Sequence, residues 1–239
     1  GEAALGRAAG LTLPPAGTGR PHLRAQGNSA EGKAIWVIKG DDVVVENIEF
    51  SGAVVRDGNG AGIRQEGTNL TVRNSYFHDN QMGLLAGDDP NSTIIIEYSE
   101  FADSRSDSAL AHNIYVNFID RFILRHSYVH GATRGHNVKS RARRTDLLYN
   151  RIADEKTGRS SYVVDLPNGG YATLLGNIIQ QGSQTQNYNV IAYGEEGYEY
   201  VRNKLFLSHN TVVNDRSSGT FVFVPDRARR VQLVNNIFS

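Results

Sequence analysis

Eight short segments of the chain share one pattern of apolar and polar positions. Each segment has aliphatic residues at alternating places, a polar or aromatic residue at its fifth place, and another apolar residue two or three places on. This alternation predicts a half-buried β-strand, and asparagine at the fifth place favours a tight corner because it tolerates left-handed backbone conformations. Each segment is therefore expected to form a strand, a corner and a second strand. The segments are residues 43–50, 70–77, 94–101, 122–129, 146–153, 173–180, 206–213 and 232–239.

The fifth position recurs at a nearly constant spacing. It falls at residues 47, 74, 98, 126, 150, 177, 210 and 236, and it is Asn everywhere except at Tyr98 and His126. A second set of short strands is predicted between these segments, at residues 61–67, 82–88, 112–117, 136–141, 161–167, 189–194 and 220–225. Two strand sets that alternate every ~25 residues, without helical spacing between them, indicate a solenoid rather than βαβ units.

This repeat resembles the right-handed parallel β-helix of pectate-lyase-like, carbohydrate-active proteins, over roughly residues 35–239. The resemblance implies an all-β fold: a single-stranded right-handed parallel β-helix, or solenoid, of about 8 coils, in one domain that covers residues 1–239. Residues 1–34 are expected to form the N-terminal cap and first coil, with a short helix over residues 1–12 where apolar residues have helical spacing. A β-sandwich or barrel is the alternative.

The composition narrows the class of partner. The chain has 25 Lys and Arg against 25 Asp and Glu, and this zero net charge argues against nucleic-acid binding. It has no cysteine, which excludes disulfides and a Cys-based zinc site, and no apolar run approaches the ~18 residues of a membrane span. The resemblance implies a secreted or periplasmic protein. The last coil has no capping segment, so an oligomer formed through this coil is also expected.

Basic residues gather in one ten-residue stretch, GHNVKSRARR at residues 135–144, although the chain is neutral overall. A similar sequence, AHNIYVN, lies at residues 111–117. In a solenoid these two stretches belong to consecutive coils. A local cationic surface is therefore expected in the middle of the stack. Its basic side chains are His136, Lys139, Arg141, Arg143 and Arg144.

Parallel stacking places equivalent residues of successive coils about 4.8 Å apart, with side chains alternately inward and outward. When the second strand set is aligned on its first buried aliphatic residue, the next residue of each strand should face solvent. This alignment predicts that Tyr115, Lys139 and Asp165 are vertical neighbours. The full outward row is Arg64, Leu85, Tyr115, Lys139, Asp165, Ala192 and Phe223, and a second outward row is Glu66, Gly87, Asn117, Arg141 and Pro167.

The same alignment places His112 over His136 and Asn113 over Asn137 at one margin of this face. For any one of these residues the alternative is ordinary solvated surface, including exposed ion pairs of small value. As a set, a face of His, Asn, Tyr, Lys and Arg favours a site for an anionic polymer.

The set offers every group that β-elimination on a uronate requires. The reaction needs a cation or amide for the C6 carboxylate, a base for the C5 proton and an acid for the leaving oxygen. Lys139 is the predicted base, because Arg141 beside it is expected to lower its pKa. The other roles are shared: Arg141 with Asn113 or Asn137 for the carboxylate, and Tyr115, His112 or His136 for the acid. Further substrate-binding candidates are Arg64, Asn117, Asp165 and Arg143.

The expected function is therefore a polysaccharide lyase that cleaves an acidic, uronate-containing polysaccharide. Three alternatives stay open. A uronate C5-epimerase shares the proton abstraction, and a non-catalytic carbohydrate-binding or surface β-helix would use the same face. Glycoside hydrolysis needs two carboxyl groups at a set separation, and the outward rows offer only Asp165 and Glu66, four coils apart. A hydrolase is therefore the least favoured of the three.

Calcium is a candidate cofactor, but no metal ligands are assigned from the sequence. Short acidic loops can hold Ca²⁺ through their oxygen atoms, although at the corner of a coil they more often make turns. The loops in question are residues 41–42, 57–59 and 88–89.

Overall fold

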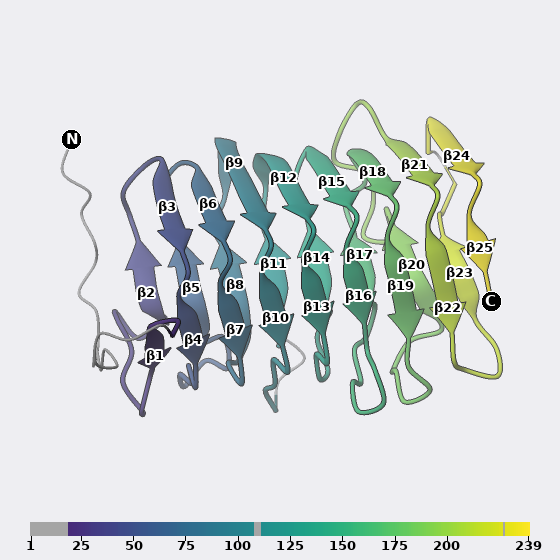
Figure 1. The fold of residues 1–239 in the computed structure, drawn as a ribbon. Helices are drawn as coiled ribbons and strands as arrows, with labels where there is room; N and C mark the ends of the chain where they lie inside the picture. Colours follow the sequence, from purple (N-terminus) through teal and green to yellow (C-terminus); the bar gives the residue numbers. More distant parts are fainter. Residues whose placement is uncertain (1–18, 108–110, 227) are drawn as a thin grey trace.

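The chain forms a parallel β-solenoid of the right-handed type, with about eight coils stacked along one axis (Figure 1). The computed structural model describes residues 19–107, 111–226 and 228–239. These residues form 25 strands and no helix, so the described part of the chain contains no helix that could cross a membrane. The helix predicted over residues 1–12 lies outside the described residues.

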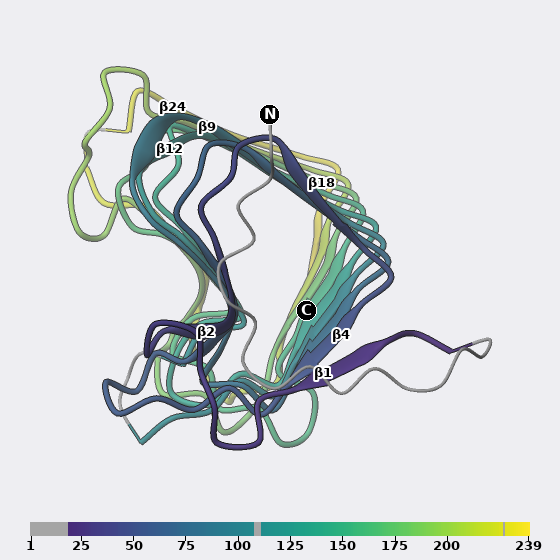
Figure 2. The same cartoon turned by 90° about the vertical axis from the view of Figure 1, so that its left-hand side faces the viewer.

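Each coil contributes one strand to each of three parallel sheets, which form the three walls seen along the axis in Figure 2. Apart from β2 (Ala34–Ile38), which was not predicted, the strands of sheet A correspond to the second strand set of the sequence. Its strands, in order, are β2 (Ala34–Ile38), β5 (Ala61–Gln65), β8 (Met82–Ala86), β11 (Ile114–Val116), β14 (Val138–Ser140), β17 (Val164–Leu166), β20 (Asn189–Tyr193) and β23 (Thr220–Phe223).

Apart from β1 (His22–Arg24), every strand of the other two sheets lies in or overlaps one of the eight repeated segments, as the strand, corner, strand pattern predicts. Sheet C consists of β3 (Val43–Glu46), β6 (Leu70–Arg73), β9 (Asp89–Glu97), β12 (Ile119–Arg125), β15 (Arg144–Leu148), β18 (Tyr171–Leu175), β21 (Lys204–Ser208) and β24 (Arg230–Val234). Sheet B consists of β1 (His22–Arg24), β4 (Glu49–Ser51), β7 (Tyr76–His78), β10 (Glu100–Ala102), β13 (Tyr128–His130), β16 (Arg151–Ala153), β19 (Ile178–Gln181), β22 (Thr211–Asn214) and β25 (Ile237–Phe238).

The predicted alignment of the corners is wrong by one residue in the second half of the chain. Arg125 pairs with Leu148, so His126 is equivalent to Tyr149 and not to Asn150. His126 and Tyr149 both have left-handed backbone, with φ of 50° and 57°. The outward corner row therefore continues through Tyr149, while Asn150 belongs to the next, buried row.

That buried row forms a ladder of side-chain hydrogen bonds along the inside of the corner. The Nδ2 of Asn150 donates to Asn177 Oδ1 at 3.0 Å, and the Nδ2 of Asn177 donates to Asn210 Oδ1 at 2.9 Å. The side-chain amides also bond to the backbone of a neighbouring coil. For example, Asn177 Oδ1 accepts from the backbone N–H of Asn150, and Asn177 Nδ2 donates to Leu147 O. The ladder satisfies backbone groups that the corner would otherwise leave unpaired in the interior.

The interior is a continuous aliphatic and aromatic column. Phe50, Phe77 and Phe101 occupy one inward row of sheet B, with stacked rings 4.7 and 4.4 Å apart. Inward Gly83 on β8 makes room for this row, because a Cβ there would lie 2.7 Å from the ring of Phe101. The aromatic column gives the stack a rigid support for the sheet A strands.

The final coil leaves several apolar side chains exposed. Leu233 on β24 is 48% exposed and Ile237 on β25 is 62% exposed. Association through this coil requires a second chain, so the predicted oligomer stays a prediction.

Candidate functional site

Three neighbouring strands of sheet A bring the predicted site residues together. Tyr115 on β11 pairs in register with Lys139 on β14, and Lys139 pairs with Asp165 on β17. The predicted vertical neighbours are therefore confirmed. Their side chains also meet: Lys139 Nζ lies 3.1 Å from Asp165 Oδ2 and 5.7 Å from the centroid of the Tyr115 ring.

The outward row is much less exposed than the alternation predicts. Lys139 is 8% exposed and Asp165 is fully buried. The reason is the segment of residues 194–203, which joins β20 to β21 and contacts this face through Glu196 and Tyr200. The first half of the row is covered too, since Val37 and Leu85 pack in a small apolar cluster outside the sheet. The prediction that the whole row faces solvent is therefore wrong.

Glu196 presents its carboxylate to the two basic side chains of the site. One of its oxygens lies 3.1 Å from Lys139 Nζ, and the other lies 2.7 Å from Arg141 Nη1. The Glu196 side chain is 43% exposed, whereas those of Lys139 and Arg141 are 10% and 15% exposed. Two largely buried cations therefore hold a carboxylate that comes from a surface loop.

Arg141 also connects the phenol of Tyr115 to this group. The Nε of Arg141 donates to the Tyr115 oxygen at 2.9 Å, and the Tyr115 hydroxyl donates to Asn117 Oδ1 at 3.0 Å. Arg141 Nη1 further donates to Asn168 Oδ1. Arg141 therefore fixes the phenolic oxygen of Tyr115 beside the carboxylate of Glu196.

The predicted low pKa of Lys139 is wrong. Burial by itself would lower the pKa of Lys139, but the carboxylates of Asp165 and Glu196 outweigh it and raise the pKa above its ordinary value. The neighbouring Arg141 was expected to lower it, but its charge is balanced by Glu196. Lys139 is therefore held as a cation, which suits binding a carboxylate better than removing a proton.

His112 and His136 lie one above the other at the margin, as predicted, with ring centroids 4.8 Å apart. Each Nδ1 accepts a backbone N–H from the next coil, from His136 in the first case and from Tyr162 in the second. Burial lowers the pKa of His112 to about 3 and that of His136 well below its usual range. Both rings are therefore neutral and align adjacent coils, and Tyr115 is the better candidate for proton transfer.

Asn113 and Asn137 lie outside the reach of a substrate in this structure. Both are fully buried. Asn113 Nδ2 donates to Asn137 Oδ1 at 2.9 Å, and Asn137 Nδ2 donates to the buried Asp154 at 3.0 Å. They form a second internal ladder at a corner, so their predicted contact with a substrate carboxylate is not supported by their position.

Two other predicted residues lie apart from the Lys139 group. Arg143 pairs with Asp120, with Nη2 2.6 Å from Oδ1, and its side chain is 59% exposed. Arg64 lies on the row of Tyr115 but two strands away, with Leu85 between them.

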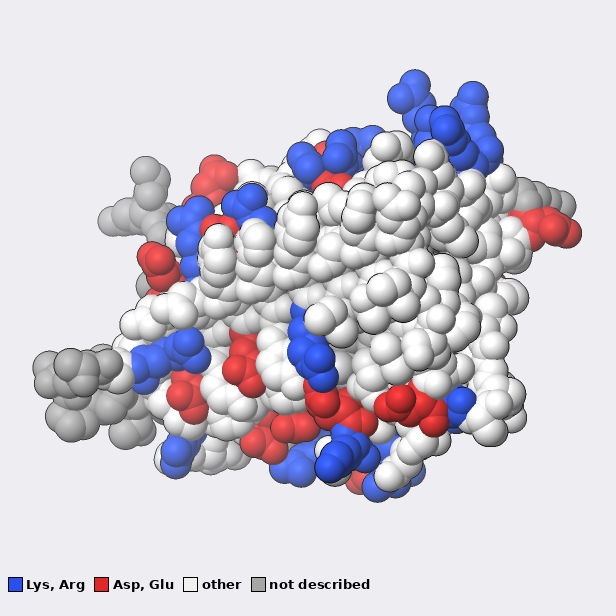
Figure 3. All heavy atoms as spheres, turned by 45° about the vertical axis from the view of Figure 1, so that its right-hand side comes forward, with Lys and Arg blue, Asp and Glu red and all other residues white. Residues whose placement is uncertain are grey.

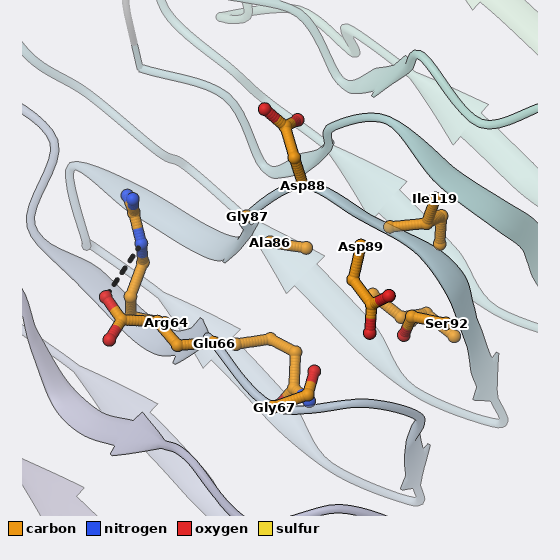
Figure 4. A pocket seen from close by; sticks show the side chains of 11 residues that line it. Arg64, Glu66, Gly67, Ala86, Gly87, Asp88, Asp89, Ser92 and Ile119 are labelled. Atoms are coloured by element: carbon orange, nitrogen blue, oxygen red, sulfur yellow. Dashed lines mark hydrogen bonds and ion pairs between the residues drawn. The ribbon is translucent and has the colours of Figure 1, made fainter.

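Arg64 borders a pocket of about 260 Å³ (Figure 4). Its guanidinium lies 3.7 Å from Glu66, and the pocket is otherwise lined by Asp88 and Asp89 among its charged residues. Three carboxylates against one guanidinium make this pocket unfavourable for an anionic sugar. This pocket is therefore not where a uronate is expected to bind.

The basic side chains of residues 139–144 are paired with acidic groups and do not form one free cationic patch. Each of these four side chains has an acidic partner. Lys139 and Arg141 pair with Glu196, Arg143 pairs with Asp120, and Arg144 pairs with Asp146. On the face drawn in Figure 3, basic and acidic side chains intermingle along the lower margin and at the upper left, while a group of basic side chains stands alone at the upper right.

Three carboxylates meet beside Lys139, one oxygen each from Asp165, Glu195 and Glu196 within 4.8 Å of one another. The expectation that the site has no close pair of acids is therefore wrong, because two of them come from the loop. Burial raises the pKa of Asp165 to about 7, although Lys139 opposes it. Burial also acts to raise the pKa of Glu196, but Arg141 and Lys139 outweigh it and lower it.

These carboxylates could share a hard cation, since Ca²⁺ prefers oxygen ligands. Lys139 and Arg141 already balance most of their charge. The acidic loops considered from the sequence accept backbone hydrogen bonds: Asp41 from the Thr68 N–H and Asp88 from the Phe118 N–H of the next coil, and Asp89 from the Asn91 N–H of its own loop.

Sequence reasoning missed Glu195, Glu196, Asn168 and Tyr200. The last three contact Arg141 directly. The longest interval between repeats, from Asn177 to Asn210, indicated an insertion in this coil. The spacing alone could not show that the insertion folds back over sheet A.

Comparisons with known proteins assign no family to this chain. No protein-family model matches it, and no curated protein and no solved structure matches it. The resemblance to pectate-lyase-like proteins is therefore supported at the level of the parallel β-solenoid fold.

Proposed function

We propose that this protein is a polysaccharide lyase that binds an acidic, uronate-containing polysaccharide at the Lys139 site and cleaves it by β-elimination. The observation that carries the proposal is the carboxylate of Glu196, held between Lys139 and Arg141 beside the phenol of Tyr115. A uronate carboxylate has the same charge and shape as this group. Substrates of this kind occur outside the cytoplasm, so the proposal includes the predicted secreted or periplasmic location.

Substrate binding requires the uronate to take the place of Glu196. The Glu196 side chain lies on a loop and is nearly half exposed, so it can leave without disturbing the strands. Lys139 and Arg141 are fixed on β14 and just beyond it, and they keep their orientation through Asp165 and Asn168. The cations then neutralise the substrate carboxylate, which makes the adjacent C5 proton more acidic.

Tyr115 is the group best placed to move the proton. In β-elimination the C5–H bond breaks, its electron pair forms the C4=C5 double bond, and the bond from C4 to the leaving oxygen breaks. Once the hydroxyl proton of Tyr115 has been released to solvent, its oxygen, which Arg141 Nε contacts at 2.9 Å, accepts the C5 proton and then gives it to the leaving oxygen. Lys139, the base expected from the sequence, acts here as a carboxylate-binding cation.

Glycoside hydrolysis is the second candidate, favoured by the pair of acids that the structure brings together. The pKa of Asp165 is raised to about 7 and that of Glu196 is lowered. Opposed shifts of two neighbouring carboxyl groups are typical of an acid and base pair. Asp165 is fully buried, however, so it would need the loop of residues 194–203 to move before it could reach a glycosidic oxygen.

The deciding experiment incubates the purified chain with alginate, pectate, glucuronan and glycosaminoglycans, with and without chelator. Reducing ends and the ultraviolet absorbance of the unsaturated product are followed together. A lyase increases both signals, and a hydrolase increases the reducing ends alone. An epimerase changes the polymer, seen by NMR, without either signal, and a non-catalytic binder leaves the polymer intact.

Two variants test the assigned roles. We expect Tyr115→Phe and Lys139→Ala each to lower the rate by about 10²-fold or more, with an unchanged far-ultraviolet circular dichroism spectrum. The matched control is Tyr188→Phe, since Tyr188 is exposed and lies beyond the site. Wild-type rates from both site variants would show that this face of the solenoid is not the active site.

A further inference from the structure

A second cluster of chemistry-bearing side chains lies on sheet B, at the N-terminal end of the stack. His22 on β1 pairs in register with Glu49 on β4, and His78 on β7 pairs with Ser51, two residues beyond Glu49. All three side chains leave the same outer face of the sheet. Their ligand atoms lie within 4.8 Å of one another, so three successive coils each contribute one group to a single point.

The distances within this cluster match those between ligands of one metal ion. Glu49 Oε1 lies 3.1 Å from His22 Nδ1 and 3.0 Å from His78 Nε2. Two ligands that bind one Zn²⁺ at their usual lengths of about 2.0–2.2 Å lie roughly 3.3 Å apart in a tetrahedral site. The three groups therefore need only small shifts to share an ion.

One of the ring nitrogens that faces Glu49, Nδ1 of His22, carries no hydrogen atom. Arg24 Nε donates to His22 Nδ1 at 3.1 Å, and because arginine only donates, this nitrogen carries a lone pair. The other nitrogen of His22 then carries the hydrogen and donates to Ser51 Oγ at 2.7 Å.

His78 is oriented in the way that metal-binding histidines usually are. Its Nδ1 lies 2.8 Å from Asp79 Oδ2 and its Nε2 lies 3.0 Å from Glu49 Oε1, so in the tautomer with the hydrogen on Nδ1 that nitrogen donates to Asp79 and Nε2 is free to bind a metal ion. A carboxylate on the second ring nitrogen is the common support of a histidine ligand. A cation between Glu49 and the two rings would satisfy every one of these atoms.

We propose that His22, Glu49 and His78 form a binding site for a divalent transition-metal ion of the Zn²⁺ class, which clamps the first three coils together. Two imidazoles and one carboxylate are a suitable ligand set for such an ion, and water would complete the coordination. Arg24 is exposed and must turn away from His22 when the ion binds. The site lies on a different sheet from the Lys139 site and is independent of the proposed function.

The test measures Zn²⁺ binding to chelator-treated protein by isothermal titration calorimetry, and thermal unfolding with and without the ion. We expect one ion per chain and a higher melting temperature. His22→Ala, Glu49→Gln and His78→Ala should each weaken binding by at least about tenfold, whereas Arg24→Gln should tighten it. Glu49→Gln keeps the shape of the side chain, so its effect does not depend on misfolding.

The matched control is His130→Ala, because His130 also lies 3.1 Å from a glutamate on the outer face of sheet B but has no second histidine partner. This variant should bind Zn²⁺ as the wild type does. The proposal is overturned if the wild type shows no saturable binding, or if the three ligand variants bind as tightly as His130→Ala.

Discussion

Single residues in this protein serve the stacking of coils and the chemistry of the site at the same time. His112 and His136 accept backbone N–H groups from the next coil, and this fixes both rings as neutral. His136 Nε2 lies 3.3 Å from Asp165 Oδ2, so the same ring also borders the carboxylate that holds Lys139. Protonation of these rings would break the backbone contact and place a new charge beside Lys139.

The stability of the protein should therefore fall as the pH is lowered from 6.5. The pKa of His112 is about 3 in the folded state against 6.5 when unfolded, so the unfolded chain binds more protons in this interval, and His136 acts in the same direction. Asp165 opposes them between about pH 4 and 7, because its pKa is raised in the folded state.

Urea unfolding at pH 7, 6 and 5 measures how the free energy of unfolding depends on pH. The lowered pKa values of His22, His112 and His136 act against the raised pKa values of Asp154 and Asp165, and we expect a net loss of stability toward pH 5. Asp165→Asn removes one of the opposing groups, and its loss per pH unit should be steeper. A stability that is constant or rises toward pH 5 would contradict the assignment of neutral histidines.

At this scale the sequence predicted which residues meet, but not their charge states. Tyr115, Lys139 and Asp165 are neighbours because the period of a strand is two residues and the coils are in register. The raised pKa of Lys139 depends on Glu196, which follows β20 by a loop whose path no periodicity encodes.

At the scale of the elements, the corner between sheets C and B depends on its buried asparagines. Asn177 accepts from the Asn150 N–H and donates to Leu147 O, so one side chain satisfies two backbone groups of the preceding coil. The sequence predicted that asparagine marks this corner. It did not separate the outward row of His126 and Tyr149 from the buried row of Asn150, because the two rows are adjacent residues.

Substitution of one buried asparagine tests whether the hydrogen-bond ladder stabilises the corner. Asn177→Ala should lower the free energy of unfolding by about 2–4 kcal/mol, because it leaves buried backbone groups without partners. The measurement is urea unfolding, with Asn91→Ala as the control, since Asn91 is exposed and its loss should cost less than about 0.5 kcal/mol. Equal costs for the two variants would mean that the ladder does not support the corner.

At the scale of the whole molecule, the two proposed sites lie on different sheets of the solenoid. Sheet A carries the Lys139 site under the loop of residues 194–203, and sheet B carries the His22, Glu49 and His78 cluster near the N-terminal end. The stack of about eight coils was predictable because strand period and repeat length are local properties of the sequence. The covering of sheet A was not, because it depends on loops of irregular length.

The central claim is that Lys139 and Arg141 bind a substrate carboxylate at the position that Glu196 now occupies. The most direct test measures, by calorimetry, the affinity of an uncleaved oligouronate for Tyr115→Phe protein, with and without Glu196→Gln. Removing a charged contact worth about 1.5–3 kcal/mol should tighten binding by about tenfold or more, while Glu199→Gln on the same loop should change little. Unchanged or weaker binding in the Glu196→Gln protein would contradict the account.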